Sequence, residues 1–241
     1  MSGYRELWPG GPLFDPDGYT APGTDSLLLA GFARMRGAEK GMDLGCGTGI
    51  VTLLLLARSE RLRMTALELD PCAAGAARRN LEANALSDRG EVVTGDIRAV
   101  RELFRHGSFD LVVANPPYFP AKSGAVSPDE KRAEARSELN CTLGDVCAAA
   151  GFLCRSGGRF ALVHKPERLA ALFAAMRTAG IEPKRLRTVH PRPDAAPCLV
   201  LVEGVRGGHP GLTIEAPLYM KDGSGCDSEE LRRICRLGEE K

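Results

Sequence analysis

A glycine-rich turn is the first group of residues in this sequence whose types and spacing could serve chemistry. The segment reads Asp43-Leu44-Gly45-Cys46-Gly47-Thr48-Gly49 and lies between a predicted strand and a predicted helix. Glycines at alternate positions let the backbone turn sharply and approach a ligand closely. The spacing is not the GxGxxG dinucleotide fingerprint, and no Lys-Ser/Thr follows as a P-loop requires. The turn therefore predicts a nucleoside site without a pyrophosphate.

Two carboxylates follow at the ends of the next predicted strands. Glu68 ends the second strand, where its carboxylate can accept hydrogen bonds from both ribose hydroxyls. Asp96 ends the third strand, where it can accept a hydrogen bond from the amine of a bound adenine. The turn and the two carboxylates together indicate a binding site for an adenine nucleoside.

As a set, these features resemble the cofactor side of class I S-adenosylmethionine-dependent methyltransferases across about residues 38–206. The resemblance implies S-adenosyl-L-methionine as cofactor, with its methionine moiety at Asp43 and the glycines, its ribose at Glu68 and its adenine at Asp96. The cofactor-binding residues predicted on this basis are Asp43, Gly45, Cys46, Gly47, Thr48, Gly49, Glu68, Leu69, Asp96, Ile97 and Asn115.

The segment Asn115-Pro116-Pro117-Tyr118 directly follows the fourth predicted strand and is the predicted catalytic site. An adenine amine is a poor nucleophile because its lone pair is delocalised into the ring. The Asn115 side-chain oxygen and the Pro116 carbonyl can each accept one amine hydrogen, which directs the lone pair at the sulfonium methyl. Consecutive prolines fix this geometry in advance. Tyr118 and Phe119 offer flat faces on which an extruded base can stack.

The Asn-Pro-Pro-Tyr motif alone leaves the acceptor open. It is shared by methyltransferases of adenine and cytosine amines, of guanine amines with small changes, and of the glutamine amide in peptide release factors. The glutamine enzymes carry a sizeable helical domain before the core, whereas here the glycine turn begins by Gly45. A non-catalytic nucleoside-binding module is the alternative from another class, and the intact motif argues against it.

Several segments outside the motif resemble the bacterial tRNA adenine-N6 methyltransferases that act in the anticodon loop of valine tRNA. They are Gly18-Tyr19, Thr24 to Ala30, Ala135-Arg136, Pro166-Glu167-Arg168, His190 to Pro193 and Pro217 to Tyr219. One departure is Thr20 to Gly23, where the family usually carries a basic-aromatic pair. The resemblance implies a tRNA anticodon stem-loop as partner, and the predicted substrate-binding residues are Tyr118, Phe119, Arg136, Lys165 and Arg192.

The elements that must position these residues are read from the apolar pattern. Strand-length apolar runs alternate with stretches of helical period, which is typical of a parallel sheet flanked by helices. Strands are expected to end at Leu44 and to cover Met64–Leu69, Glu91–Thr94, Phe109–Ala114, Arg159–His164, Arg185–Val189 and Cys198–Val205. Helices are expected from Thr24 or Asp25 to about Gly37, around Ile50–Leu56, over Pro71–Ala83 and Leu139–Cys154, and from Pro166 to Gly180. Residues 116–137 are expected to form a mobile active-site loop.

The predicted fold is an α/β Rossmann-like methyltransferase fold. We expect a mostly parallel seven-stranded sheet with helices on both faces and a C-terminal antiparallel hairpin. Residues 1–37 are expected to form an N-terminal extension and first helix of the same domain, residues 38–206 the core, and residues 207–241 a tail without firm structure.

Composition excludes several other classes. The formal net charge is +1, so any nucleic-acid contact must come from a local patch. The 8 cysteines form no CxxC pair and have no His partner at zinc spacing, so we expect no metal and reduced thiols. No signal peptide and no apolar run of membrane-spanning length is recognisable. We therefore expect a cytoplasmic monomer with no membrane contact and no obligate protein partner.

Overall fold

The computed structural model describes residues 3–19, 23–116 and 141–235 of the chain. Its main element is a sheet in the order β5-β4-β3-β6-β7-β9-β8-β10, with β11 also pairing with β8. The strands are β3 (Lys40–Leu44), β4 (Arg63–Glu68), β5 (Gly90–Thr94), β6 (Phe109–Ala114), β7 (Cys154–His164), β8 (Ile181–His190), β9 (Leu199–Arg206), β10 (Thr213–Ile214) and β11 (Leu218–Tyr219). Within this sheet, β9 alone runs antiparallel to its neighbours, β7 and β8. A separate antiparallel pair is formed by β1 (Arg5–Glu6) and β2 (Leu13–Phe14). The predicted mostly parallel sheet with an antiparallel hairpin is confirmed, but the sheet is 9-stranded rather than seven-stranded, because β10 and β11 of the tail pair with β8.

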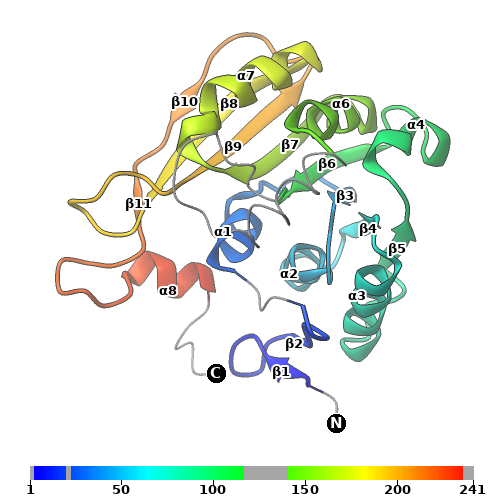
Figure 1. Cartoon of the computed structure of the whole chain (residues 1–241), viewed down its shortest axis with the longest axis horizontal. Helices are drawn as coiled ribbons and strands as arrows, with labels where there is room; N and C mark the ends of the chain where they lie inside the picture. The colour runs from blue at the N-terminus through cyan, green and yellow to red at the C-terminus, as the bar shows by residue number, and fades with distance from the viewer. Residues whose placement is uncertain (1–2, 20–22, 117–140, 236–241) are drawn as a thin grey trace, which may run out of the picture.

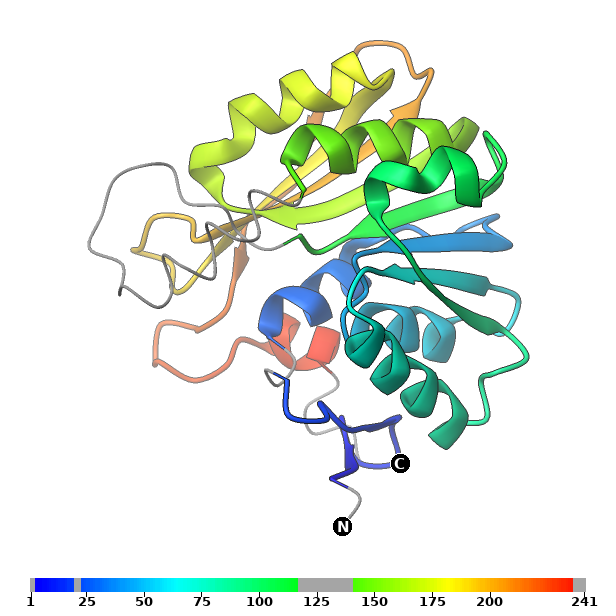
Figure 2. The same cartoon turned by 45° about the vertical axis from the view of Figure 1, so that its right-hand side comes forward.

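Helices cover both faces of this sheet (Figures 1 and 2). One layer consists of α1 (Thr24–Phe32), α2 (Ile50–Arg58), α3 (Pro71–Ala83) and α8 (Glu229–Cys235), and the other of α4 (Val100–Leu103), α6 (Leu143–Leu153) and α7 (Leu169–Thr178). The short turns η1 (Ile97–Ala99) and η2 (Pro166–Arg168) precede α4 and α7. Alternate β6 residues enter the two cores: Leu111 and Val113 face the first layer, and Val112 and Ala114 face the second.

The order of the strands determines where a ligand can bind. From β3 the chain continues outward through β4 and β5, and it then returns to place β6 on the other side of β3. The connections therefore leave the sheet in opposite directions at the β3/β6 junction, which opens a crevice at the carboxyl ends of these two strands. Asp43 and Asn115 both lie at this junction, as their sequence positions predicted.

Several predicted boundaries are wrong, and each has a local cause. Helix α1 ends at Phe32 rather than near Gly37, because the Arg34 N–H donates to the buried Glu203 carboxylate at 3.2 Å. Helix α6 starts at Leu143, since Thr142 forms a reciprocal capping box with Asp145. The predicted turn at Ser156 to Gly158 is instead part of β7, which opposes β6 with a register shift.

The tail is also more ordered than predicted. Strands β10 and β11 pair parallel with β8, at Thr213 opposite Arg185 and Leu218 opposite Val189. Leu231 of α8 is buried in the same core cluster as α1 (Figure 2). Strands of two residues are too short to show periodicity, so they could not be predicted from the apolar pattern. No helix in residues 3–19, 23–116 or 141–235 combines the length and apolar character that crossing a bilayer requires.

Candidate active site

The glycine turn joins β3 to α2 as predicted. Gly45, Gly47 and Gly49 have φ values of 71°, 55° and 85°, which non-glycine residues rarely adopt. The N–H groups of Gly45 and Cys46 donate to Leu67 O on β4 at 2.8 and 3.1 Å. A Cβ on Gly47 would meet no heavy atom within 4 Å, so the turn is open on its cleft side.

Asp43 lies beneath this turn and is 1% exposed. Its Oδ2 accepts hydrogen bonds from the Thr52 hydroxyl at 2.7 Å and from the Thr52 N–H at 3.1 Å. Burial raises the pKa of Asp43 to about 7; Thr52 opposes this shift, and the nearby Glu68 adds to it. Asp43 is thus a carboxyl group whose charge changes near neutral pH.

Glu68 connects the end of β4 to the glycine turn. Its Oε2 accepts from the Gly47 N–H at 2.8 Å, and its Oε1 accepts from the Asp70 N–H at 2.9 Å. Each carboxylate oxygen has two acceptor positions, so these bonds leave acceptor capacity for hydroxyl donors. Leu69, beside it, is 51% exposed and presents an apolar surface next to the turn.

Asp96 has a partner that the sequence did not indicate. The side chain of Arg98 donates to both Asp96 oxygens, with Nε at 3.1 Å from Oδ1 and 2.9 Å from Oδ2. This hydrogen bonding is the main cause that lowers the pKa of Asp96. The Asp96 Oδ1 also accepts from the Arg98 N–H and caps η1. Ile97 follows, with its Cδ1 3.7 Å from the position of a Cβ on Gly45.

Asn115 lies directly beyond β6, whose Ala114 is the register partner of Leu44 on β3. It is half-buried, and its Nδ2 donates to Ser26 Oγ of α1 at 2.9 Å. This bond uses the amide nitrogen and orients the amide, and it does not use the acceptor atom Oδ1. Pro116 is buried. The other predicted catalytic and stacking residues, Pro117, Tyr118 and Phe119, lie outside the described residues.

A cleft of about 370 Å³ lies between the glycine turn and Asn115. Predicted cofactor residues that line it are Asp43, Gly45, Cys46, Gly47, Thr48 and Asn115. It is also lined by residues that were not predicted as site residues, namely Phe14, Tyr19, Gly23, Asp25, Ser26, Ile50 and Val51. Gly49, Glu68, Leu69, Asp96 and Ile97 adjoin the turn without lining this cleft. The unselected residues come mostly from the N-terminal segment and α1, which form the wall opposite the glycine turn.

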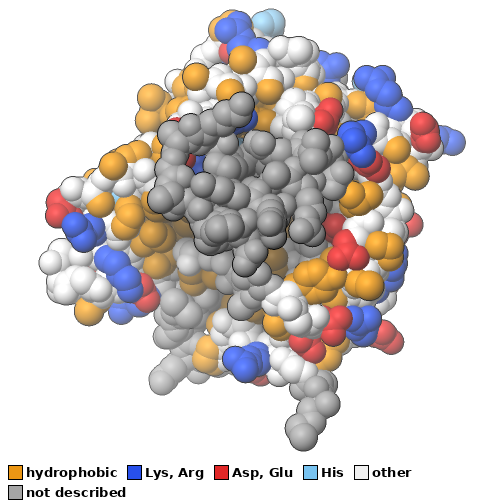
Figure 3. All heavy atoms as spheres, in the orientation of Figure 1, with side chains coloured by type: hydrophobic (Ala, Val, Ile, Leu, Met, Phe, Trp, Pro, Cys, Tyr) orange, Lys and Arg blue, Asp and Glu red, His pale blue; other side chains and the backbone are white. Residues whose placement is uncertain are grey.

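The predicted substrate residues lie farther from the cleft or are not described. Lys165 follows β7, and Arg192 follows β8 with its Nε 2.8 Å from Asp194 Oδ1. Both follow strands parallel to β6, so they lie at the same sheet edge as Asn115. Arg136 and the predicted loop over residues 116–137 lie outside the described residues, except for Pro116. On the face shown in Figure 3, the Lys and Arg side chains in view lie at separate places, several of them beside Asp or Glu side chains.

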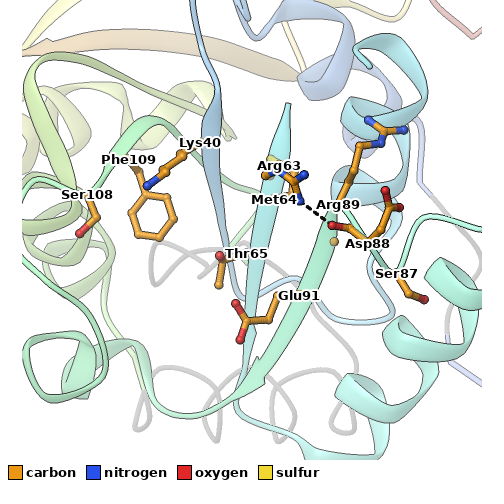
Figure 4. Close-up of a pocket in the computed structure, with 11 residues that line it drawn as sticks. Lys40, Arg63, Met64, Thr65, Ser87, Asp88, Arg89, Glu91, Ser108 and Phe109 are labelled. Carbon is orange, nitrogen blue, oxygen red and sulfur yellow. Dashed lines mark hydrogen bonds between the residues drawn. The ribbon is translucent and has the colours of Figure 1, made fainter. Parts of the chain in front are cut away.

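A second cleft, of about 360 Å³, lies at the other end of the same strands (Figure 4). Lys40, Arg63 and Phe109 line it, and they are the first residues of β3, β4 and β6. Arg63 Nη1 donates to Asp88 O at 2.6 Å across one side. No residue of the predicted site lines this cleft, and it opens at the amino edge of the sheet, away from Asn115. Within the described ranges, no group of His, Cys, Asp and Glu side chains could hold a metal ion.

Comparison with known proteins identifies the family. The profile of the methyltransferase small domain matches residues 21–142. The chain is a member of this methyltransferase family. A tRNA1(Val) (adenine(37)-N6)-methyltransferase from Porphyromonas gingivalis is 35% identical over 187 residues, covering 75% of this chain and 72% of that protein. The enzyme of the same name from Tolumonas auensis is 34% identical over 203 residues, covering 83% and 81%.

Solved structures agree with this assignment. The crystal structure of a predicted O-methyltransferase from Agrobacterium tumefaciens matches with a TM-score of 0.72 at 26% identity, over 88% of this methyltransferase and 95% of that chain. The predicted class I fold, family and enzyme class are confirmed, and S-adenosylmethionine is the methyl donor of this methyltransferase.

The described cleft fits this cofactor. The turn is open at Gly47, a carboxylate with spare acceptor capacity lies at Glu68, and Asp43 is a buried acid below them. These groups match a ribose diol and a cationic amine, which are the polar parts of S-adenosylmethionine.

Proposed function

We propose that this methyltransferase transfers a methyl group from S-adenosylmethionine to the exocyclic N6 amine of an adenine in a tRNA anticodon loop. The observation that carries the proposal is Asn115, which lines the same cleft as the glycine turn with its amide nitrogen bonded to Ser26. The substrate comes from the curated relatives, whose names specify adenine 37 of tRNA1(Val).

The proposed chemistry divides between donor and protein. S-adenosylmethionine supplies an electrophilic methyl group on a positively charged sulfur. Asn115 Oδ1 accepts a hydrogen bond from the adenine amine, and the Pro116 carbonyl accepts the second amine hydrogen. Two fixed acceptors hold the amine in line for attack and draw its lone pair out of conjugation with the ring. Asn cannot act as a general base, so the proton leaves to water after methyl transfer.

The proposed cofactor contacts lie in the cleft at the glycine turn and at the residues that adjoin this turn. Asp43 and the glycines Gly45, Gly47 and Gly49, with Cys46 and Thr48, hold the methionine moiety. Glu68 and Leu69 hold the ribose, and Asp96 and Ile97 border the adenine. For Asp96 this requires Arg98 to share the carboxylate or release it, because the two side chains now pair. Lys165 and Arg192, with Arg136, Tyr118 and Phe119, are proposed to contact the RNA.

The substrate is tested by methylation with radiolabelled S-adenosylmethionine on total RNA, with ribonuclease and protease controls. We expect ribonuclease-sensitive label in the tRNA fraction and N6-methyladenosine after digestion to nucleosides. Transcripts of the valine anticodon stem-loop with adenine or guanine at position 37 then locate the base. Label that resists ribonuclease but not protease would identify a protein amide as acceptor instead. Label in rRNA or DNA alone would also contradict the proposal.

Ser26 is proposed to position Asn115. Replacing Ser26 with alanine removes the acceptor of the Asn115 amide, so we expect kcat to fall about 10-fold, as for one lost hydrogen bond in a buried site. The KM for tRNA and the affinity for the cofactor should change little, because Ser26 lines the cleft but is assigned no hydrogen bond to either ligand. Thr24→Ala, an exposed residue in the same helical turn, is the control. Equal kcat values for both variants would contradict a positioning role.

The raised pKa of Asp43, about 7, predicts a pH dependence of cofactor affinity. A bound ammonium group favours the ionised carboxylate, so binding below pH 7 must first remove a proton. We expect affinity for S-adenosylhomocysteine to rise about 10-fold from pH 6 to pH 8, which corresponds to about one pKa unit of proton linkage. Asp43→Asn should bind more weakly with a flat pH profile, as measured by calorimetry. A wild-type profile that is equally flat would remove Asp43 from the cofactor site.

The raised pKa of Asp43 has the opposite effect on the folding stability of the unliganded protein, which falls as the pH rises. The folded pKa of Asp43 lies above the value of an unfolded aspartate, so the folded state holds a proton that the unfolded state releases between about pH 4 and pH 7. The contribution of Asp43 to stability is therefore lost as the pH rises through this window. We also propose that the enzyme is a monomer, which light scattering tests. Residues 1–37 are proposed to belong to the same domain as the core, residues 38–206, and residues 207–241 to form a C-terminal tail.

A further inference from the structure

The N-terminal segment, residues 3–19, is held beside α3 by two asparagine side chains. Each of them pairs with both the N–H and the carbonyl oxygen of one backbone residue. Asn84 accepts from the Leu13 N–H at 2.8 Å and donates to Leu13 O at 2.7 Å. Asn80 accepts from the Asp15 N–H at 2.9 Å and donates to Asp15 O at 3.0 Å. The two asparagines are four residues apart and so lie on one face of α3. These bonds hold β2 and the residues after it beside α3. Figure 1 shows β2 near this helix.

Asn80 also connects this docking to the glycine turn. It is 1% exposed, and its Nδ2 donates to Thr48 O at 3.0 Å in addition to Asp15 O. One buried side chain therefore contacts both walls of the cleft. Phe14, between the two docked residues, is buried and lines the cleft itself.

A tight turn then directs the chain over the cleft. Asp17 and Gly18 have φ values of 51° and 82°, and the Tyr19 N–H donates to Pro16 O at 2.9 Å. Asp17 in this conformation is strained, and two contacts hold it: its N–H donates to Asp15 Oδ1, and its carboxylate pairs with Arg79. A strained turn held by several contacts places Tyr19 in one position.

Tyr19 completes the wall of the cleft by a hydrogen bond to Asp70, which lies two residues after Glu68, the carboxylate proposed to bind the ribose. Its hydroxyl donates to Asp70 Oδ2 at 2.6 Å, and the residue lines the cleft. Asp70 Oδ1 accepts from the Cys72 N–H and caps α3, while the Asp70 N–H donates to Glu68 Oε1. The Tyr19–Asp70 bond and Glu68 thus share one short stretch of backbone.

We propose that residues 13–19 are a cover for the bound methyl donor, and that the Tyr19–Asp70 hydrogen bond is the clasp that closes this cover over the ribose end of the cleft. The inference rests on the proposed placement of the ribose at Glu68. Cofactor binding and docking of the N-terminal segment are then linked, since both order the stretch from Glu68 to Asp70. Breaking the clasp would let the cover move away from a bound ligand, so we expect the clasp to act mainly on the dissociation rate.

The clasp persists across the physiological pH range. Hydrogen bonding to Asp70 raises the pKa of Tyr19 to about 12, and the same bond lowers the pKa of Asp70. The phenol therefore keeps the proton that it donates, and the carboxylate stays ionised to accept it.

The first test is the affinity of the full-length protein for S-adenosylhomocysteine, measured by calorimetry, with its dissociation rate from stopped-flow. Tyr19→Phe keeps the ring and removes the donor, so we expect about 3- to 10-fold weaker binding, the range for one exposed hydrogen bond, mostly through faster dissociation. Asp70→Ser keeps a helix cap but is too short to reach Tyr19, and it should give the same loss. Because both changes break one bond, the double variant should be no weaker than either single variant.

The matched control is Tyr4→Phe. Tyr4 precedes the cover in the chain and donates its hydroxyl to Arg79 O of α3 at 3.2 Å, but it does not line the cleft. This variant should bind with wild-type affinity. If Tyr19→Phe matched Tyr4→Phe in affinity and dissociation rate, the clasp would be disproved.

A second readout does not depend on substitution. In hydrogen exchange of the wild type, the amides of Leu13, Asp15 and Tyr19 should exchange at least several-fold more slowly when S-adenosylhomocysteine is bound. Unchanged exchange at these amides, with ligand demonstrably bound, would overturn the cover. A wild type that fails to bind the ligand at all would instead overturn the cofactor site on which the inference rests, so the two failures are distinguishable.

Discussion

Replacing Asn115 with alanine is expected to lower kcat for tRNA methylation by about 100- to 1,000-fold, the loss measured for one preorganised acceptor or donor at a reacting centre. The alanine variant cannot accept the amine hydrogen, so the lone pair stays conjugated with the ring and the amine is no longer held in line. Binding of S-adenosylhomocysteine should remain within about 3-fold of wild type, because the alanine methyl leaves the glycine turn and Glu68 unchanged.

Single-turnover methylation of a valine anticodon stem-loop transcript measures the chemical step, and calorimetry measures the cofactor. Asn115→Asp is the informative second variant. It keeps two acceptor oxygens but removes the amide that donates to Ser26 Oγ at 2.9 Å, so its rate should lie between those of wild type and Asn115→Ala. A wild-type rate in Asn115→Ala would show that methyl transfer occurs elsewhere in the protein.

The glycine turn and Asn115 could be predicted from the sequence because their positions follow from local order along the chain. A turn after the first strand and a polar residue after the fourth must meet wherever the strand order reverses between them, and β3 and β6 are neighbours. The alternating apolar residues of β6 likewise fix which faces are buried. These features depend on pattern and topology alone.

The opposite wall of the cleft could not be predicted in this way. Tyr19 reaches the site because the preceding residues are bonded to Asn80 and Asn84, and nothing in the sequence around these asparagines distinguishes them from surface residues of a helix. Ser26 reaches it because α1 packs against α2 and the sheet. Asp96 was predicted as a free acceptor, and its pairing with Arg98 depends on side-chain conformation. The missed contacts are therefore those made between segments distant in sequence or by flexible side chains.

Replacing Glu68 with glutamine is expected to weaken binding of S-adenosylhomocysteine by about 100-fold. The carboxylate is proposed to accept hydrogen bonds from both ribose hydroxyls, and a bond to a charged group is worth roughly 1.5–3 kcal/mol, against about 1 kcal/mol for a neutral bond. A loss of about 1.4 kcal/mol on each of the two bonds corresponds to the 100-fold change. Glutamine also presents an NH2 group where Glu68 now accepts from Gly47 or Asp70. A stability cost is expected as well, and thermal unfolding without ligand separates this cost from the binding loss.

The control for charge is Glu91→Gln, an exposed carboxylate on the neighbouring strand β5 that lines the opposite cleft (Figure 4). It should bind S-adenosylhomocysteine as the wild type does. A ligand-side change then isolates the ribose contact: the 2′-deoxy analogue should bind the wild type about 10-fold more weakly than the parent compound, the value of one charge-assisted hydrogen bond. The Glu68→Gln variant should discriminate less between the two ligands, because the lost hydroxyl has no carboxylate to meet. If both proteins discriminated equally, the ribose would not lie at Glu68. The proposed clasp, which rests on that placement, would then be contradicted as well.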